Sequence, residues 1–301
     1  PGPAAPGVSP SGGDAAAFIA DLRRAVDGAV DDSVRRRAEY STDASNYRVV
    51  PQVVVAPRDV DDALAALAVA REHGVPVTPR GAGTSCAGNA VGPGLVLDLA
   101  EHVNRILDVD PEARTARVEP GVILSSLQQV AAPHGLRFGP DPSTQNRATL
   151  GGMIGNNACG PHAVAWGKTA ENVLELDVVD GAGRRFTASS DARLGGGALD
   201  AVPGLQRLVD TNLADIRTHF GRFGRQVSGY SLEHLLPERG ADLAKMLVGS
   251  EGTLGTVLGA TVRLVPLPTK PVLVVLGYPT MAHAADAVPA LLAHEPLAVE
   301  G

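Results

Sequence analysis

The stretch from Thr149 to Gly160, TLGGMIGNNACG, decides the fold of this chain. It holds four glycines among small polar residues, so a ligand can approach its backbone more closely than a backbone lined with larger side chains. Two similar segments occur elsewhere, Pro79 to Asn89 (PRGAGTSCAGN) and Gly249 to Gly255 (GSEGTLG). We call these segments the first loop (79–89), the second loop (149–160) and the third loop (249–255). Together they predict a site built largely from main-chain groups.

Main-chain N–H groups in glycine-rich turns form concave anion sites without much positive side-chain charge. Several such turns predict one long ligand with a pyrophosphate, and FAD meets that description. Other nucleotide motifs fail: Cys86 stands where GxGxxG needs its last glycine, and His162 stands where a P-loop ending at Gly167 needs its first. No HExxH or GxSxG string occurs, so metallopeptidase and nucleophile-elbow chemistry are not indicated.

The composition is that of a globular chain that can bury a substantial core, with 301 residues of which 44% are hydrophobic. Lys and Arg number 26 against 33 Asp and Glu, for a formal net charge of -7, which argues against nucleic acid as a partner. No apolar run approaches the roughly 18 residues of a membrane span. We expect a cytoplasmic chain. An electron acceptor in the membrane would bring it to the inner face of that membrane.

The two cysteines, Cys86 and Cys159, each lie in a glycine-rich loop. They have no CxxC spacing and no paired histidines, so we expect neither a zinc site nor a disulfide, and no metal ligands in this chain. Two alternatives stay open for them, as small residues that tolerate burial or as groups with a redox or nucleophilic role.

The apolar runs predict an α+β chain with several parts. Residues 1–14 are expected to be a disordered tail, and residues 15–48 an N-terminal helical segment. Residues 49–268 are expected to form the nucleotide-binding domain, as two subdomains divided near residue 120. Three prolines in 266–271 mark its end, and residues 269–301 are expected to begin an incomplete second domain.

Within these parts the period of the apolar residues and the turn signals predict individual elements. A hairpin is expected around the glycines at 181 and 183, and Asp59 is expected to cap a helix. We expect strands at 53–56, 75–78, 95–99, 106–109, 115–119, 173–179, 184–188, 256–265 and 272–276, and helices at 15–30, 60–74, 121–132, 205–220 and 282–293, the last interrupted or restarted at Pro289.

The three loops in combination resemble the FAD-binding domain of the vanillyl-alcohol oxidase and p-cresol methylhydroxylase superfamily, over roughly Tyr40 to Leu267. Within that span, QVSGYSLEHLLP (226–237) and NRATLGGMIGNNACGPHAVAWGKTAENV (146–173) are most similar to long bacterial D-2-hydroxyacid dehydrogenases, which include D-2-hydroxyglutarate and D-lactate dehydrogenases. The resemblance implies a two-subdomain FAD-binding fold followed by the start of a truncated α+β substrate domain.

The resemblance also implies which residues contact FAD. In the first loop these surround the pyrophosphate: Pro79, Arg80, Gly81, Ala82, Gly83, Thr84, Ser85, Gly88 and Asn89. Along the ribityl chain and flavin they are Thr149, Gly152, Gly155, Asn156 and Gly160, and Pro142 would shape the wall of the site. On the pyrophosphate or adenine side they are Glu251, Gly252, Gly255 and Val257. For each glycine, turn geometry alone is the alternative. No histidine stands at Thr84 or Ser85, as it often does in relatives with covalent flavin, so we expect non-covalent FAD.

By the same resemblance, a D-2-hydroxyacid is oxidised to the 2-oxo acid by hydride transfer to flavin N5. No catalytic base is assigned in this chain, and Arg225 and Tyr230 are the candidates for facing the substrate. A divalent metal and iron–sulfur clusters would lie outside it. The electron acceptor would be an iron–sulfur module, an electron-transfer flavoprotein or a quinone. Two alternatives stay open: an alcohol or aldehyde oxidase of the same superfamily, and a flavin module that only transfers electrons.

Overall fold

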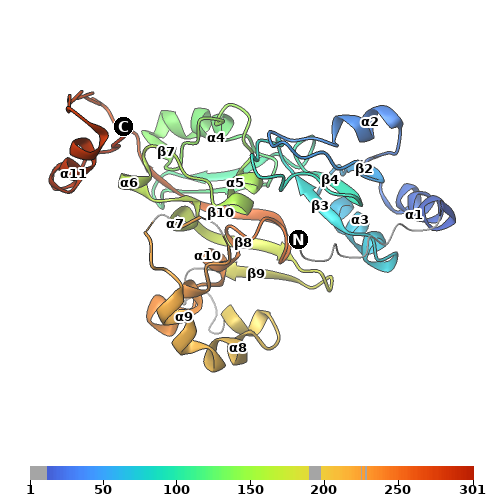
Figure 1. Cartoon of the computed structure of the whole chain (residues 1–301). Helices are drawn as coiled ribbons and strands as arrows, with labels where there is room; N and C mark the ends of the chain where they lie inside the picture. The colour runs from blue at the N-terminus through green and yellow to red at the C-terminus, as the bar shows by residue number, and fades with distance from the viewer. Residues whose placement is uncertain (1–11, 190–197, 225, 228) are drawn as a thin grey trace. The chain divides into compact units, whose positions relative to one another are not determined.

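The computed structural model of the chain, drawn in Figure 1, divides into two compact units. It describes residues 12–189, 198–224, 226–227 and 229–301. Unit 1 runs to Val103 and includes Gly181–Gly183, and unit 2 comprises Asn104–Asp180 and Arg184–Gly301. The boundary after Val103 comes earlier in the chain than the division predicted near residue 120.

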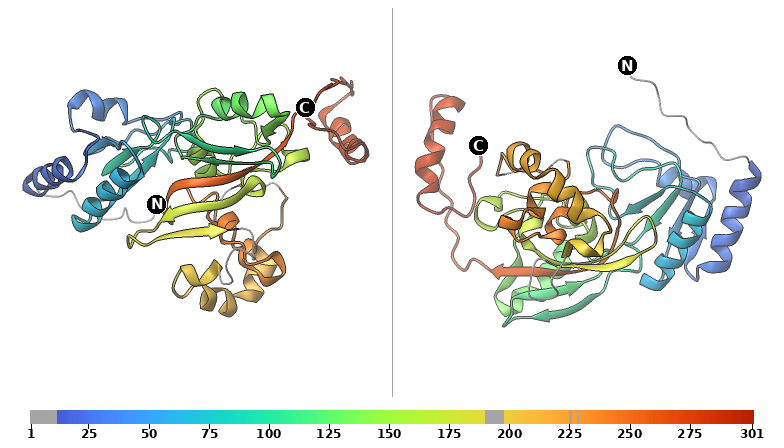
Figure 2. Two further views of the ribbon diagram at one scale, coloured as in Figure 1. Left: turned by 180° about the vertical axis from the view of Figure 1, so that it is seen from behind. Right: turned by 90° about the horizontal axis from the view of Figure 1, so that it is seen from below.

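Unit 1 is a four-stranded sheet with helices packed on it. Its elements are α1 (Gly12–Ala25), β1 (Ala29–Asp31), α2 (Val34–Glu39), β2 (Val53–Ala56), α3 (Val60–Glu72), β3 (Val77–Arg80) and β4 (Leu95–Asp98). The strand order is β1-β2-β4-β3, in which β1 is antiparallel to β2 and the other pairs are parallel. Figure 2 shows α1 and α3 beside each other, and both contribute to one apolar core with the sheet.

The helix α3 confirms the prediction made from its apolar spacing and its cap. Asp59 accepts a hydrogen bond from the Asp62 N–H at 2.9 Å, which satisfies one of the free donors at the start of the helix. Ala63, Ala66 and Ala70 are fully buried against the sheet, as expected for one face of an amphipathic helix.

The N-terminal segment 15–48 differs from the prediction because it contains the strand β1 as well as helices. The Asp62 carboxylate accepts the N–H groups of Asp27 and Gly28 at 2.8 and 2.9 Å, which fixes the turn between α1 and β1. A Cβ on Gly28 would lie 2.2 Å from the Ala56 carbonyl oxygen, so only glycine allows this approach to the sheet. The pairing partner is remote in the sequence and left no local signal.

The helix α1 begins at Gly12, inside the stretch 1–14 that was expected to be a tail. Residues 1–11 lie outside the described part of the chain. The residues predicted to form the apolar side of this first helix are all buried: Phe18, Leu22 and Val26.

Unit 2 is built on an antiparallel sheet. Its strands are β5 (Ile106–Asp110), β6 (Thr115–Val118), β7 (Leu136–Phe138), β8 (Val173–Val179), β9 (Arg185–Ser189) and β10 (Thr256–Pro266). Their order is β5-β6-β10-β8-β9, and β7 also pairs with β10. β8 and β9 pair as the hairpin that was predicted around residues 181–183.

Short helices cover this sheet. They are α4 (Leu124–Ala131), η1 (Ala132–His134), α5 (Leu150–Asn156), α6 (Ala163–Trp166), α7 (Thr169–Asn172), η3 (Ala198–Ala201), α8 (Leu205–Thr211), α9 (Leu213–His219), η4 (Leu232–Leu235), η5 (Pro237–Arg239) and α10 (Leu243–Leu247). In Figure 1, α4 lies next to β7, and α8 and α9 lie beyond β9. Residues of α4, α5, α8, α9 and α10 belong to one apolar core with the sheet. The helix predicted over 205–220 is broken into α8 and α9 at Asn212.

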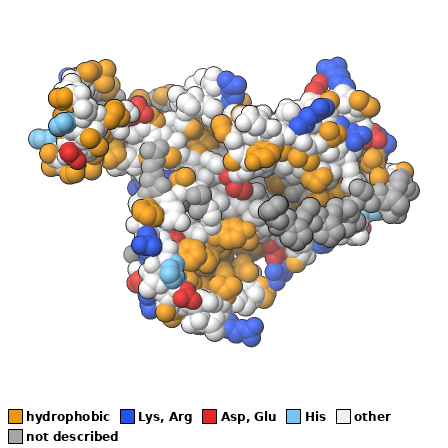
Figure 3. Space-filling view, in the orientation of Figure 1, with side chains coloured by type: hydrophobic (Ala, Val, Ile, Leu, Met, Phe, Trp, Pro, Cys, Tyr) orange, Lys and Arg blue, Asp and Glu red, His pale blue; other side chains and the backbone are white. Residues whose placement is uncertain are grey.

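The C-terminal segment contains no strand, although one was predicted at 272–276. Residues 267–280 have neither helix nor strand, and Val272, Leu273 and Val275 are 84 to 88% exposed. A strand needs a neighbour to accept its backbone hydrogen bonds, and the described residues provide none here. The helix α11 (Met281–Leu292) does form, continuous through Pro289, and none of its residues is buried. Figure 3 shows hydrophobic side chains at the surface of this C-terminal segment, at upper left.

Candidate functional site

The second loop forms a short helix with one bare face. Thr149 caps α5 by accepting a hydrogen bond from the Gly152 N–H at 3.2 Å, and its own 2% exposure means that it holds the helix instead of facing solvent. Gly152, Gly155 and Asn156 lie at i, i+3 and i+4 spacing on the accessible side of α5. Two of the three have no side chain, so a flat ring can lie directly against the helix backbone.

The third loop packs against the end of α5. The N–H groups of Gly249 and Glu251 donate to the carbonyl oxygens of Ile154 and Gly155, both at 2.9 Å. The Asn156 side-chain amide donates to Glu251 Oε1 at 2.8 Å. The structure therefore brings together two of the three loops that the sequence singled out.

Two residues at this junction adopt left-handed backbone, which side-chain-bearing residues rarely do. Asn157 has φ +54° and Glu251 has φ +53°. The Asn157 side chain is held by a hydrogen bond from the Ala170 N–H at 3.0 Å. Such strained conformations persist only where the surroundings enforce them, and they cluster at functional sites.

The glycines near the junction serve different purposes. A Cβ on Gly160 would lie 2.3 Å from the Asp141 carbonyl oxygen, and a Cβ on Gly255 would lie 2.7 Å from Val178 Cγ1. Close packing is therefore a sufficient reason for both of these glycines. A Cβ on Gly155 would meet nothing within the described part of the chain closer than 3.9 Å. Packing gives no reason for glycine at that position.

The first loop follows β3 in unit 1 and has the features of an anion site. The N–H groups of residues 81–85 donate no hydrogen bond within the part of the chain that the structure describes. Gly83 and Gly88 have φ +65° and +82°, which is backbone that favours glycine. Ala82 is exposed, and the other predicted residues of this loop are partly buried: Pro79, Arg80, Gly81, Thr84, Ser85 and Asn89.

The Arg80 side chain turns into the first loop. Its Nη1 donates to the carbonyl oxygens of Thr42 and Ala90 at 3.0 and 2.9 Å. A Cβ on Gly83 would lie 2.3 Å from Nη2, so the loop closes tightly over the guanidinium. Sequence reasoning missed the contribution of the segment around Thr42. The residues Asp43 and Ser45, which favour turns, are the signal that could have found it.

The remaining predicted residues are placed as follows. The Tyr230 hydroxyl lies 2.8 Å from Thr253 Oγ1, so Tyr230 contacts the third loop. Arg225 lies outside the described residues. Pro142 is partly buried between β7 and α5, and Val257 is partly buried in β10.

A histidine–carboxylate pair lies beside the second loop and was not predicted. His162 Nδ1 lies 2.5 Å from Asp141 Oδ2, and the imidazole stacks on the Trp166 ring at 4.8 Å between centroids. The Arg137 guanidinium also lies over Trp166, at 4.8 Å. These side chains form one packed cluster, and no motif or residue spacing in the sequence predicts it.

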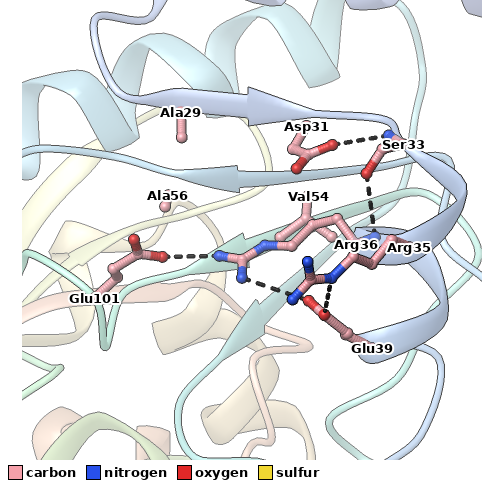
Figure 4. Close-up of a pocket in the computed structure, with 9 residues that line it drawn as sticks. All are labelled: Ala29, Asp31, Ser33, Arg35, Arg36, Glu39, Val54, Ala56 and Glu101. Carbon is pink, nitrogen blue, oxygen red and sulfur yellow. Dashed lines mark hydrogen bonds and ion pairs between the residues drawn. The ribbon is translucent and has the colours of Figure 1, made fainter.

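A separate cavity of about 330 Å³ in unit 1 is shown in Figure 4. Its floor includes Val54 and Ala56, and its walls carry charged side chains. These charges are paired with one another: Arg36 with Glu101 at 2.8 Å, and Arg35 with Glu39 at 2.9 Å. The charges are thus already satisfied within the protein.

Three further observations bear on the class of site. Cys86 is exposed and Cys159 is partly buried. Within residues 12–189, 198–224, 226–227 and 229–301, no three His, Cys, Asp or Glu side chains gather as a metal site. None of the described helices is both long enough and apolar enough to span a membrane.

Comparison with known proteins agrees with the loops. Residues 51–189 match the model of a family described as an FAD binding domain. D-2-hydroxyglutarate dehydrogenases of Pseudomonas putida and Escherichia coli are 37% and 35% identical, over 88% of this chain and 27% of theirs. The glycolate oxidase subunit GlcD of Bacillus subtilis is 36% identical over 87% of this chain and 47% of its own length.

The chain thus spans 27% of the length of those dehydrogenases and 47% of that subunit. Among solved structures, an alkyldihydroxyacetonephosphate synthase matches with a TM-score of 0.65 at 18% identity, over 93% of this chain and 46% of the other. This likeness concerns the fold alone, and it confirms the α+β fold class that the apolar runs predicted.

Proposed function

The chain belongs to the FAD-binding domain family matched over residues 51–189, and we propose that it holds FAD for the oxidation of a D-2-hydroxyacid to the 2-oxo acid. The observation that carries this proposal is the bare face of α5 with the third loop docked against its end. The D-2-hydroxyglutarate dehydrogenases among its relatives support the substrate class. GlcD, named for glycolate oxidase, points to the same chemical class.

The residues present fit FAD in two ways. The unused N–H groups of residues 81–85 suit the oxygens of a pyrophosphate, which carry full negative charge. The side-chain-free surface at Gly152 and Gly155 suits a planar ring, because no Cβ holds the ring away from the backbone. Glu251 and Asn156 would keep the third loop against this surface through their 2.8 Å hydrogen bond.

FAD, when bound, supplies the acceptor for the hydride that leaves C2 of the hydroxyacid. The chain itself binds and orients. The first loop would fix the pyrophosphate, and α5 would fix the plane of the ring. Tyr230, tied to Thr253 at 2.8 Å, is our candidate for the substrate side. A divalent metal, iron–sulfur clusters and the base that accepts the hydroxyl proton are assigned to no residue of this chain.

Residues 269–301 are proposed to begin the substrate domain. Val272, Leu273 and Val275 are exposed in an extended segment, and α11 buries none of its residues. An exposed apolar surface of this kind is typical of a segment that further strands and helices cover. The boundaries at residues 49 and 268 remain predictions.

The cofactor proposal is tested with the chain of residues 1–301 by thiol labelling. Cys86 lies in the first loop and Cys159 in the second. Single-thiol variants Cys86→Ser and Cys159→Ser report on one loop each. Added FAD is expected to slow labelling at both positions, whereas AMP is expected to slow neither to the same extent. Unchanged labelling at both cysteines under saturating FAD would reject the site.

The substrate proposal is tested with the protein as the cell makes it. D-2-hydroxyglutarate, D-lactate and glycolate are added separately without oxygen, and the visible absorbance of the flavin is followed. Bleaching by at least one D-2-hydroxyacid, and not by its L-enantiomer where it has one, is expected. Bleaching by simple alcohols alone would instead favour an alcohol oxidase, and reduction only by a partner protein would favour an electron-transfer module.

A further inference from the structure

The first loop owes its shape to a segment that lies between α2 and β2 in the chain. We call residues 40–47 (YSTDASNY) the brace. The Ala44 N–H donates to the Gly83 carbonyl at 3.1 Å, and Asp43 Oδ2 accepts the Ala90 N–H at 3.3 Å. The brace therefore contacts the loop near its start and just beyond its end. Residues 81–89 of the loop have neither helix nor strand, so these contacts replace regular structure.

The brace also contacts the loop through the Tyr47 side chain. A Cβ on Gly88 would lie 2.6 Å from Tyr47 Cδ2, so the loop backbone rests on the Tyr47 ring. Burial opposes ionisation of Asp43, but hydrogen bonds from Ser45 and from the Ala90 N–H outweigh it and lower the pKa of this carboxyl. Asp43 is therefore a charged acceptor at neutral pH, and hydrogen bonds to charged acceptors are the stronger kind.

Arg80 joins the brace to the loop from inside. Its Nη1 bridges the carbonyl oxygens of Thr42 in the brace and Ala90 beyond the loop, at 3.0 and 2.9 Å. Its guanidinium carbon lies 5.1 Å from the centre of the Tyr40 ring, within reach of a cation–π interaction. A guanidinium can make these contacts together because its donors are fixed in one plane, which an ammonium group cannot reproduce.

Tyr40 is in turn fixed by the sheet. Its hydroxyl donates to Asp98, which is 5% exposed and lies opposite Arg80 in the register of β3 and β4. The Arg36 guanidinium also lies over the Tyr40 ring, at 4.7 Å. Burial, and then the hydrogen bond to Asp98, raises the pKa of the Tyr40 hydroxyl, so it stays a donor at neutral pH.

We propose that Arg80 and Tyr40 are positioning residues, which hold the first loop in the shape that receives the pyrophosphate, and that the phosphates meet main-chain N–H groups instead of the Arg80 guanidinium. This proposal rests on the proposed FAD function. It also makes a distinct statement about the FAD-free chain, because the brace is complete without a ligand. Arg80 acts on the cofactor through the loop.

The experiment distinguishes two roles of Arg80, namely a positive charge for the phosphates and support of the first loop. Arg80→Lys keeps the charge but loses the planar fork, Arg80→Met loses both, and Tyr40→Phe loses only the bond to Asp98. Arg24→Lys, at an exposed position of α1, is the matched control. All variants are made in the Cys159→Ser background, so that Cys86 is the single thiol. Three quantities are measured: the labelling rate of Cys86 without FAD, the thermal midpoint, and the dissociation constant for FAD.

We expect Arg80→Lys to weaken FAD binding by about tenfold or more, to within about threefold of Arg80→Met, because two charged hydrogen bonds are lost in both. Cys86 should label several-fold faster in both variants and in Tyr40→Phe, at a temperature well below the thermal midpoint of each variant. Arg24→Lys should change neither quantity.

Two results would overturn the proposal. FAD binding by Arg80→Lys within about twofold of wild type, with Arg80→Met weakened, would make Arg80 a direct charge for the phosphates. Unchanged Cys86 labelling in all three variants would show that the brace does not hold the loop. If the Arg80 variants do not fold, Tyr40→Phe tests the proposal alone, because it keeps the aromatic ring. The labelling rate of Cys86 in this variant then shows whether the brace holds the loop. If the wild type takes up no FAD, the proposed function fails, and labelling of the FAD-free chain still tests the brace.

Discussion

Replacing Gly155 by alanine should make the FAD-free protein more stable and at the same time weaken its binding of FAD. Gly155 lies in α5 with ordinary helical backbone, since it is absent from the residues with positive φ. Apart from the backbone of α5 itself, the described atoms nearest to the Cβ of alanine would be Glu251 Cα and Oε2, both at 3.9 Å. That is ordinary van der Waals contact, so the substitution introduces no clash in the absence of a ligand.

The stability gain follows from helix propensity. Glycine in a helix costs roughly 0.5–1 kcal/mol relative to alanine, because it has more backbone freedom to lose on folding. For a unit of about 150–250 residues, 1 kcal/mol corresponds to roughly 2–4 °C in the thermal midpoint. We therefore expect the midpoint of the FAD-free variant to rise by about 1–4 °C. The added methyl group stands on the face where we place the ring, and FAD affinity should fall by about a hundredfold or more, as expected when a ring must be displaced from close contact.

The assay compares thermal unfolding of the FAD-free chain with FAD titration by fluorescence. Gly181→Ala is the control for a harmless methyl group, because no atom of the described chain lies within 4 Å of its Cβ position. Gly151→Ala is the control for a packing clash, because its Cβ would lie 2.6 Å from Pro120 Cβ. The reasoning is refuted if Gly155→Ala binds FAD like the wild type, or if it loses stability as Gly151→Ala should.

Three further outcomes follow from the same contacts. Gly83→Val should fold but hold little FAD, measured as bound flavin per chain, because φ is +65° and its Cβ would lie 2.3 Å from Arg80 Nη2; a full complement of FAD would remove this loop from the site. The pKa of Asp43 is lowered from 3.8 by its hydrogen bonds against the effect of burial, so its stabilising effect is present above that value and is lost as the pH falls through the lower folded pKa. The difference in urea stability between wild type and Asp43→Asn should accordingly shrink in acid, and a difference that grows in acid contradicts this assignment. Val274 is 70% exposed in an apolar run, so we expect the 1–301 chain to self-associate in sedimentation experiments and Val274→Asp to reduce this association; equal association of the two would show that the run does not mediate it.

Local patterns predicted the elements whose stability is local. α3 was predicted correctly because Asp59, its apolar stripe and its closing glycine all agree within one stretch of sequence. The hairpin of β8 and β9 was predicted because its turn glycines separate two apolar runs. β1 was not predicted, because its partner β2 lies more than twenty residues away and its turn depends on the Asp62 side chain. The strand expected at 272–276 has the right composition, and what it lacks is a neighbour.

The site shows the same division between local and remote causes. The three loops were found because glycine-rich bends can be read directly from the sequence, and the structure joins the second and third loops by hydrogen bonds. Arg80 was predicted to surround the pyrophosphate, and in the structure its Nη1 donates to the carbonyl oxygens of Thr42 and Ala90. The sequence showed that an arginine belongs to this loop, but it could not show which acceptor the arginine binds. A guanidinium donates to a carbonyl oxygen as readily as to a phosphate oxygen.

Glycine carries several meanings in this chain, and only coordinates separate them. Gly160 and Gly255 are required by close packing, with a Cβ 2.3 Å and 2.7 Å from a neighbouring atom. Gly83 is required by its backbone, with φ +65°. Gly155 is required by neither, and in our proposal this glycine, which costs helix stability, makes room for the ring of FAD. This is why a single methyl group at Gly155 separates the cofactor hypothesis from a purely structural role more sharply than any substitution at the other glycines.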